Sequence, residues 1–309
     1  DQANSRIFLP KLGWLRYRKS RDVLGTLKNV TVSQACDKWF VSIQTAREVE
    51  PPVPLATSAI GIDVGIARFA TMSDGTFLAP LNSFKKHEMR LRRYQRAMSR
   101  KVKFSKNWRK AKARVQRIHA RIGNARRDYL HKATTTISKS HAMASIEDWQ
   151  VRNLSRSAAG RVEAPGKHVT AKSGLNKRIL DQGWFEFRRQ LAYKLAWNGG
   201  WLIAVPPQNT SRTCPACRCV SSDNRTTQAR FVCVACGYKA HADVVGAMNI
   251  LTRGLQLLEG QDDARIACGA IQPRAGPSVR GETGTRMRYK GNGSAAMTGR
   301  LIGARWQPA

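Results

Sequence analysis

The chain has 309 residues, 42% hydrophobic and 7% aromatic, which is the composition of a globular protein with one large domain or two modest ones. Its charge is not ordinary, because 54 Lys and Arg against 20 Asp and Glu leave a formal net charge of +34 and a pI near 11.0. So much self-repulsion argues against a compact enzyme of small metabolites. It predicts a polyanionic partner, and nucleic acid is the leading candidate.

A membrane surface is the alternative polyanion. The longest apolar runs, such as 201–206, are far shorter than the roughly 20 residues that cross a bilayer. The opening Asp-Gln-Ala-Asn-Ser contains no signal-peptide core. We therefore expect no membrane partner and a cytoplasmic, nucleoid-associated protein. The sequence does not begin with Met, so we expect a processed or truncated product.

Short β-rich runs alternate with turns in the first 58 residues. Strands are predicted at 13–18, 27–32 and 39–44. Pro51-Pro-Val-Pro follows as a stiff linker. After it, an apolar strand that begins at Ala59 carries Asp63, and a turn at Ser73-Asp-Gly leads into a second short strand.

Residues 84–132 change to a helical period. Two apolar stripes, at 91–98 and at 115–129, predict an antiparallel helical hairpin with its gap near Asn107. This segment contains 19 Lys or Arg and two acids, which is half of the net charge of the whole chain. A solvated helical face is the alternative, but such faces usually alternate in sign. We therefore favour helices that line the backbone of a nucleic acid.

The remaining pattern alternates strands and helices. A short buried strand at 141–149 is followed by a Ser-, Gly- and Lys-rich stretch at 155–174, which predicts a mobile loop. One amphipathic helix is predicted from Leu180 to Leu195, then a buried strand at 201–207, and a final helix with Asp243 at its N-cap. Because the strands are nearly wholly apolar, this order predicts an α/β fold.

Four cysteines form two Cys-x-x-Cys pairs that are separated by fifteen residues: Cys214, Cys217, Cys233 and Cys236. This spacing predicts a zinc site, in which each pair wraps one turn around the metal. Two structural disulfides are disfavoured in a reducing cytosol, and a redox motif would not need duplication. Four thiolates close the coordination sphere, so the zinc is expected to be structural. The other cysteines are expected to be plain small residues: Cys36, Cys219 and Cys268.

Three acids lie inside an apolar strand, at the end of another strand and at the start of the last helix. An ionised carboxylate in an apolar layer is costly unless it is paired or bound to metal. The three acids are Asp63, Glu147 and Asp243. Clustered, they predict a Mg²⁺ site, and two such ions can activate a water and stabilise a leaving phosphodiester oxygen. Glycines 61 and 65 would let the phosphate backbone approach Asp63. Taken singly, Glu147 is explained as a strand-end acid and Asp243 as a helix cap, but Asp63 has no such explanation.

Several motifs together resemble the transposon-encoded TnpB (OrfB) family, whose members are relatives of the type V CRISPR effector nucleases. They are Gly61-Ile-Asp-Val-Gly-Ile, the strand that ends at Glu147, Asn209-Thr-Ser-Arg-Thr-Cys-Pro-Ala-Cys, the segment from Asn224 to Tyr238, and Ala242-Asp-Val-Val-Gly-Ala-Met-Asn-Ile. The resemblance covers residues 5–255, and its order of acid, acid, zinc ribbon and acid is highly specific.

This resemblance implies a RuvC-like nuclease of ribonuclease H fold with Asp63, Glu147 and Asp243 as catalytic triad. It also implies a zinc ribbon inserted before the last acid, a guide RNA from the transposon end and a target DNA that is cut. The opening segment resembles the later part of a barrel domain that grips guide RNA and the target-adjacent duplex. The expected organisation is a partial, wedge-like β-barrel at 1–58, a RuvC-like core at 59–205 with the basic hairpin 84–132, a zinc ribbon at 206–242, a final RuvC-like helix at 243–260 and a disordered tail at 261–309.

Two features depart from the family pattern. Val245 and Gly246 stand where Asn-Ala is common, which alters helix packing beside Asp243 and leaves the acid itself. The N-terminal strands and helical recognition domain usual in the family are not in this sequence, so RNA guidance rests on less than the nuclease chemistry does. We expect a Mg²⁺-dependent, RNA-guided DNA endonuclease of a mobile element. The alternatives are a nuclease-inactive, RNA-guided or plain DNA-binding regulator, and a resolvase-like nuclease that works without RNA.

Overall fold

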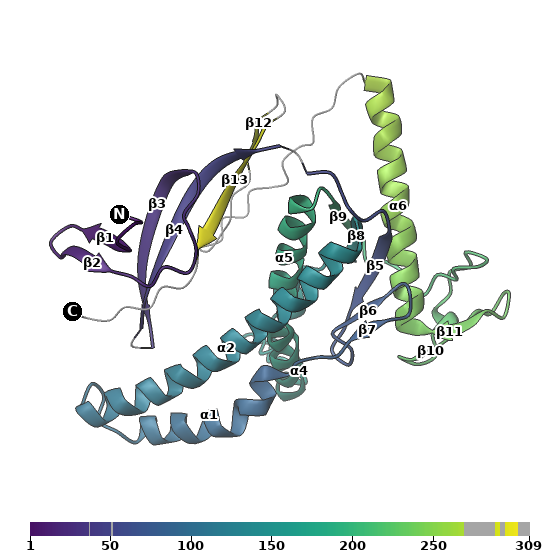
Figure 1. The fold of residues 1–309 in the computed structure, drawn as a ribbon. Helices are drawn as coiled ribbons and strands as arrows, with labels where there is room; N and C mark the ends of the chain where they lie inside the picture. Colours follow the sequence, from purple (N-terminus) through teal and green to yellow (C-terminus); the bar gives the residue numbers. More distant parts are fainter. Residues whose placement is uncertain (37, 51, 269–287, 291–293, 302–309) are drawn as a thin grey trace. The chain divides into compact units, whose positions relative to one another are not determined.

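The computed structural model of the chain describes residues 1–36, 38–50, 52–268, 288–290 and 294–301, with side chains described as far as residue 259 (Figure 1). The chain forms two compact units. One contains Asp1–Pro51, Lys103–Ala120 and Ala270–Ala309, and the other contains Pro52–Val102 and Arg121–Gly269.

The first unit is built on antiparallel strands. Strands β1 (Arg6–Leu9) and β2 (Gly13–Arg16) form a hairpin, and β3 (Thr26–Ala35) pairs along β4 (Lys38–Val49). A small core of Val23, Val41 and Ile43 lies beneath them. The three strands predicted from the sequence are confirmed, and β1 was missed.

The structure differs from the expected disordered tail at 261–309 in three stretches. Helix α6 continues to Cys268, and two strands follow, β12 (Arg288–Lys290) and β13 (Ser294–Leu301). Strand β13 pairs antiparallel with β4 and so extends that sheet to the order β12-β13-β4-β3. This pairing joins segments about 250 residues apart, which local sequence patterns do not reveal. The rest of the predicted tail lies outside the described residues.

A mixed five-stranded sheet forms the centre of the second unit and gives it the α/β character that the sequence predicted. Its strands are β5 (Ala59–Val64), β6 (Ala70–Met72), β7 (Phe77–Leu78), β8 (Met143–Glu147) and β9 (Trp201–Val205). They lie in the order β7-β6-β5-β8-β9. The pairs β5–β8 and β8–β9 are parallel, and the pairs β5–β6 and β6–β7 are antiparallel.

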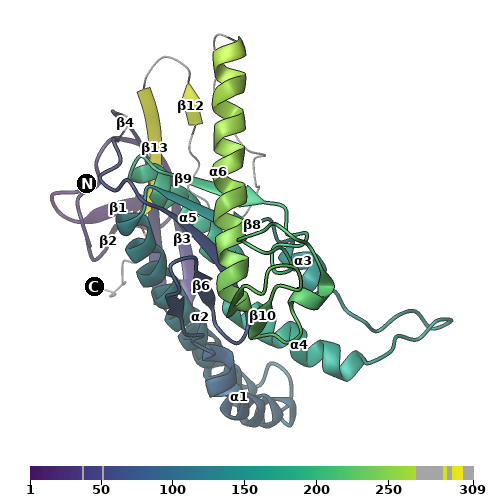
Figure 2. The ribbon, with the colours of Figure 1, turned by 90° about the vertical axis from the view of Figure 1, so that its right-hand side faces the viewer.

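Each face of this sheet is covered by helix, because strand side chains alternate between the faces. The even-numbered residues of β5 and β8 pack into the main core with α2 (Lys106–Ser140) and α5 (Trp184–Trp197). The odd-numbered residues face α6 (Ala242–Cys268), which lies across the sheet in Figure 2.

Helix α6 approaches the sheet so closely that glycine is needed at the contact. A Cβ at Gly61 would lie 2.0 Å from the carbonyl oxygen of Ala247, and a Cβ at Gly254 would lie 1.9 Å from Ser145 Oγ. The expectation that Gly61 leaves room for a phosphate backbone is therefore wrong. Backbone of α6 already fills that space, and Gly61 serves helix-to-sheet packing.

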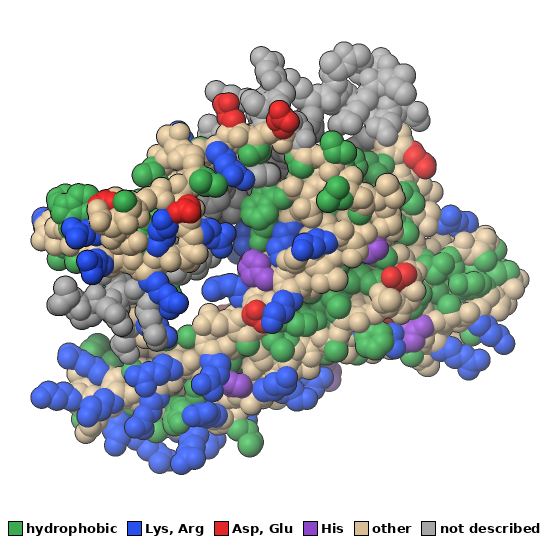
Figure 3. Space-filling model, in the orientation of Figure 1, with side chains coloured by type: hydrophobic (Ala, Val, Ile, Leu, Met, Phe, Trp, Pro, Cys, Tyr) green, Lys and Arg blue, Asp and Glu red, His purple; other side chains and the backbone are tan. Residues whose placement is uncertain are grey.

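Two helices follow β7, α1 (Ser83–Ser99) and α2, with a break at 100–105. Two basic helices are present as predicted, but Asn107 lies inside α2 and not in the gap, and α2 continues beyond residue 132 to Ser140. Figure 3 shows Lys and Arg side chains gathered over these helices. Helix α1 begins without a cap from its own Asn82, and the buried Asp181 carboxylate instead accepts hydrogen bonds from Ser83 Oγ and from the Phe84 N–H.

The region between β8 and β9 holds more helix than predicted. Helix α3 (Val151–Leu154) follows β8, and α4 (Val169–Gln182) begins inside the stretch 155–174 that was expected to be a loop. The single helix predicted from Leu180 to Leu195 is wrong as well. Gly183 adopts a left-handed conformation, with φ of 75°, and divides α4 from α5.

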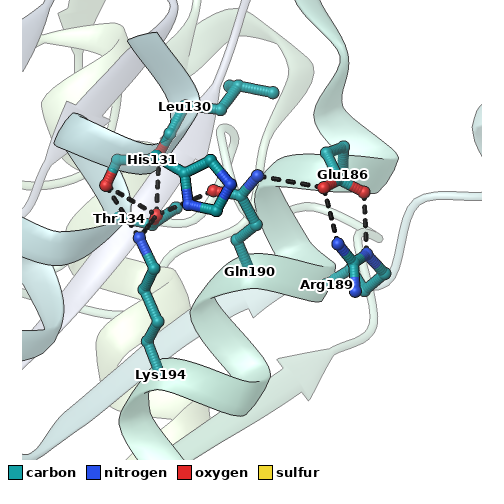
Figure 4. Close-up of polar contacts among 7 residues, drawn as sticks. All are labelled: Leu130, His131, Thr134, Glu186, Arg189, Gln190 and Lys194. Atoms are coloured by element: carbon teal, nitrogen blue, oxygen red, sulfur yellow. Dashed lines mark hydrogen bonds and ion pairs between the residues drawn. The ribbon is translucent and has the colours of Figure 1, made fainter. Parts of the chain in front are cut away.

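A buried polar cluster joins α2 to α5 (Figure 4). Lys194 Nζ donates to the carbonyl oxygen of His131 and to the hydroxyl of Thr134, both at 2.7 Å. Thr134 also contacts Gln190, which donates to Glu186, and Glu186 forms two hydrogen bonds with the Arg189 guanidinium. Burial lowers the pKa of Lys194 to about 8. The cluster fixes the register of the two helices.

Candidate functional site

Two of the predicted acids are neighbours because of strand register. In the parallel pair of β5 and β8, Gly61 lies opposite Ser145 and Ile62 opposite Ile146, so the next residues are Asp63 and Glu147. Both are odd-numbered and belong to the face that α6 covers. Parallel strands end at the same edge of a sheet, and the two carboxylates therefore lie side by side at the carboxyl ends of their strands.

The third acid comes from α6. Asp243 is in the first turn of that helix, and one turn later Gly246 faces Asp63 so closely that a Cβ would lie 2.9 Å from Asp63 Oδ2. The prediction that Asp243 is the N-cap is wrong by two positions. The helix begins at Ala242, and the N–H of Asp243 donates to Nδ1 of His241, 3.2 Å away. The Asp243 carboxylate is therefore not used by the helix end.

The charges of Glu147 and Asp243 both act on Asp63. The pKa of Asp63 is raised from 3.8 to about 8, first by burial and then by repulsion from Glu147 and Asp243, while Arg225 opposes the rise. Burial also raises the pKa of Glu147, and hydrogen bonds from its neighbours oppose that shift. Negative charges held close together in a partly buried site favour the binding of a cation.

The carboxylates are close without being tightly clustered. Among the described residues, the group of possible metal ligands whose atoms all lie within 4.8 Å of one another is the four cysteines. Asp148, the acid next to Glu147, contacts the Arg188 guanidinium at 2.5 Å and belongs to a separate ion pair.

Two hydrogen bonds hold the Glu147 carboxylate. Thr210 Oγ1 donates to Oε1 at 2.5 Å, and the Trp149 indole N–H donates to Oε2. Thr210 is itself held by α6, because Asn249 Nδ2 donates to the carbonyl oxygens of Thr210 and Thr213, both at 2.7 Å. Glu147 is thus fixed at both oxygens, and one of its two partners is in turn held by α6.

An arginine from the cysteine-containing segment reaches the third acid. Arg225 Nη2 lies 3.3 Å from Asp243 Oδ1 and donates to the carbonyl oxygen of Gln228 at 3.1 Å. The sequence interpretation assigned no role to Arg225, Thr210, Trp149 or Asn249. Each of the four lies inside or next to one of the sequence motifs. Nothing in the sequence distinguishes Arg225 from the other Lys and Arg residues, which number 54 in all.

The four cysteines come together between β9 and α6. Cys214 Sγ lies 3.6 Å from Cys236 Sγ, and Cys217 Sγ lies 3.5 Å from Cys233 Sγ. These separations exclude disulfides and are close to the edge, about 3.8 Å, of a sulfur tetrahedron around zinc. The group can hold a metal ion.

The two hairpin strands β10 (Arg230–Val232) and β11 (Lys239–His241) frame this group, and β11 leads directly into α6. A small core that includes Phe231 and Val245 packs beneath the sulfurs. Cys219 packs against this core and is outside the four-sulfur group, as expected from its spacing. Metal binding here therefore bears on the position of Asp243.

Comparison with known proteins gives two family matches. The OrfB_IS605 model, described as "Probable transposase", matches residues 42–158, and the model described as "Cas12f1-like, TNB domain" matches residues 184–250. The "Putative RNA-guided DNA endonuclease InsQ" of Escherichia coli (strain K12) is 56% identical over 271 residues, which are 88% of this chain. The chain belongs to the OrfB (TnpB) family. The resemblance stated from the motifs is confirmed.

Two further relatives have lower sequence identity to this chain. A "Putative RNA-guided DNA endonuclease" of Streptomyces pristinaespiralis is 34% identical over 83% of this chain, and the Cas12f1 CRISPR-associated endodeoxyribonuclease of Sulfoacidibacillus thermotolerans is 25% identical over 69%. The chain spans 65% of the length of InsQ, 58% of the Streptomyces protein and 50% of that Cas12f1.

Among solved structures, the Cas12f1–sgRNA–target DNA complex matches 72% of this chain and 55% of its own chain, with a TM-score of 0.43 and 16% identity. A CRISPR-Cas12f ternary complex matches with a TM-score of 0.40 over 69% of this chain and 42% of its own, at 17% identity. Within the described part of this OrfB protein, no helix is long and apolar enough to cross a membrane.

Proposed function

We propose that this OrfB protein is an RNA-guided DNA endonuclease of a mobile element, which cuts DNA by metal-dependent hydrolysis at a RuvC-like site. The observation that carries the proposal is the meeting of Asp63, Glu147 and Asp243 from two strands and a helix, in a chain of net charge +34. Burial and repulsion from the other two carboxylates raise the pKa of Asp63 to about 8. Perturbed pKa values are common at functional sites, and a bound cation would offset the cost of ionising Asp63.

The donor set fits Mg²⁺. Carboxylate oxygens are the ligands that this hard ion prefers, and the three acids would hold it. When bound, a pair of such ions would activate a water and stabilise the leaving oxygen of a phosphodiester.

The neighbouring residues position these acids. Thr210 and Trp149 hold Glu147 by both oxygens, which leaves its remaining lone pairs free for a ligand. Arg225 restrains Asp243 and partly neutralises the site. Asp63 accepts or releases its proton near neutral pH, because its pKa is about 8, so its charge can follow the arrival of a cation.

The four cysteines would hold a structural zinc in a ribbon at 206–242. Their sulfur separations support this, and four protein ligands leave no open position for chemistry. The zinc would then act on catalysis only indirectly, because the ribbon carries Arg225 and ends at β11, directly before α6. We propose the same domain division as the sequence analysis for 1–58, 59–205 and 243–260.

Guide RNA from the transposon end and target DNA are the proposed partners. The names of the relatives support them, and so does the excess of Lys and Arg on α1 and α2. Base pairing would read the target while the protein contacts the backbone.

The test is to purify the protein from cells that carry its native locus, sequence any co-purified RNA, and assay cleavage of DNA matched to that RNA. We expect one defined RNA and cleavage that requires Mg²⁺. Cleavage of unmatched DNA, or a preparation without defined RNA that still cuts, would support an RNA-independent nuclease instead. Bound RNA without cleavage would support a regulator.

A further inference from the structure

A pair of aromatic residues, one exposed and one half-buried, lies where α2 begins. The rings of Phe104 and Trp108 meet edge to face, with centroids 5.4 Å apart and planes at 64°. Phe104 is 63% exposed and has a φ of 70°, in the left-handed region that bulky residues rarely adopt. Trp108 is half-buried and lies within α2. A large exposed ring on a residue in a disfavoured backbone conformation, as at Phe104, is a candidate for a functional role.

Part of this arrangement has a local explanation. Ser105 caps the helix, because its Oγ accepts a hydrogen bond from the backbone N–H of Trp108 at 3.2 Å. Phe104 directly precedes this cap. An apolar residue before the cap that packs on the first turn fixes the entry of the chain into a helix. Any large aliphatic side chain would provide that contact, so helix entry alone does not require two aromatic rings.

The charges around the pair indicate what the rings bind. Lys103 Nζ lies 5.1 Å from the Phe104 ring centroid, and Lys112 Nζ lies 5.1 Å from the Trp108 ring centroid. Residues 100–114 contain eight Lys or Arg and no acid, and Figure 3 shows this part of the surface crowded with basic side chains. A ligand for such a place must offer flat apolar faces together with negative charge.

A nucleotide has both properties, because its base stacks on an aromatic ring while its phosphate pairs with lysine. We propose that Phe104 and Trp108 form a stacking site for an unpaired base of a nucleic-acid strand. The assignment deepens the proposed function and rests on it in one respect, namely that the protein binds nucleic acid. It does not depend on cleavage.

The test compares binding to a single-stranded DNA oligonucleotide that contains 2-aminopurine with binding to a duplex closed by hairpin loops at both ends. Phe104→Leu and Trp108→Leu keep an apolar contact at the helix entry and remove the stacking face. Phe77→Leu is the matched control, because Phe77 is 54% exposed and carries the Arg68 guanidinium 4.5 Å from its centroid. Lys110→Gln serves as the charge control.

We expect the two leucine variants to bind the single strand roughly five- to a hundredfold more weakly, with no loss of 2-aminopurine quenching in the Phe77 control. Closed-duplex binding and the salt dependence should stay unchanged in those variants. Lys110→Gln should instead weaken both substrates and reduce the slope of log K against log salt by about one. Phe104→Tyr and Trp108→Phe should restore binding.

Three results would overturn the proposal: leucine variants that bind the single strand as wild type does, equal losses on the single strand and the closed duplex, or tyrosine and phenylalanine variants that bind no better than leucine. A change in self-association in place of oligonucleotide binding would assign the pair to a protein contact. If the wild-type protein binds neither substrate, the proposed function fails as well, and that outcome is distinct from the others.

Discussion

Replacing Asp63 with asparagine tests the shared environment of the three carboxylates without any assay of cleavage. In the folded protein the pKa of Asp63 is about 8, against 3.8 for the free side chain. Between these values the folded state keeps the proton and the unfolded chain releases it, so the free energy of unfolding falls as pH rises. Asparagine is neutral and of similar size, and it removes this dependence.

The expected size follows from the shift. Each pH unit between 3.8 and 8 costs the wild-type protein about 1.4 kcal/mol, which makes the Asp63→Asn variant more stable than wild type by up to about 4 kcal/mol at pH 7 in the absence of added divalent cations. Solvent screening of the half-buried carboxylate makes this figure an upper limit. Below pH 4 the free energies of unfolding of the two proteins should become equal.

The measurement is urea unfolding of zinc-loaded wild type and Asp63→Asn at a series of pH values from 4 to 8, without Mg²⁺. Lys194 does not disturb the comparison, because its pKa of about 8 and its ordinary value of 10.5 confine its contribution to higher pH, where stability rises. Asp128→Asn, at an exposed ion pair with Lys132, is the control. If the free energy of unfolding changes with pH in the same way for the Asp63→Asn variant and for wild type, the pKa of Asp63 is not raised in the folded protein.

Two glycines at the α6 contact should respond differently to alanine. Gly61→Ala places a Cβ 2.0 Å from a backbone carbonyl and should destabilise the protein by about 1–3 kcal/mol in thermal unfolding; a stable variant would contradict the close helix-to-sheet packing. Gly246→Ala places a Cβ 2.9 Å from Asp63 Oδ2, the far end of a side chain, so the free energy of unfolding should stay within about 1 kcal/mol of wild type; a loss as large as that of Gly61→Ala would show that Asp63 is held rigidly. Cys233→Ser should release zinc, measured with a colorimetric chelator, and lower cleavage by loosening Arg225 from Asp243; full activity without zinc would contradict the structural role.

The meeting of the acids could be predicted from the sequence because strand geometry is simple. Asp63 lies within an apolar strand near its end and Glu147 ends another, and parallel strands of one sheet end at one edge. The register that makes them direct neighbours was not visible, but it follows once Gly61 is paired with Ser145. The cysteines were predictable for a similar reason, since their spacing alone carries the geometry.

The supporting contacts could not be predicted, because they depend on tertiary packing. The hydrogen bond that Glu147 receives from Thr210 needs the segment after β9 to come back to the end of β8. The break at Gly183 was hidden within a continuous apolar stripe. Gly61 was assigned to substrate approach because a sequence does not show which helix will cover a strand.

A cleavage assay of the Asp63→Ala variant tests whether Asp63, Glu147 and Asp243 form the site of DNA hydrolysis. The variant and wild type would each be loaded with the co-purified RNA, and cleavage of matched DNA in Mg²⁺ would be measured beside binding of the same DNA. We expect cleavage to be abolished while DNA binding stays nearly intact, because the basic surface lies on other elements. Retained cleavage in Asp63→Ala would contradict the assignment of Asp63, Glu147 and Asp243 as the site of hydrolysis.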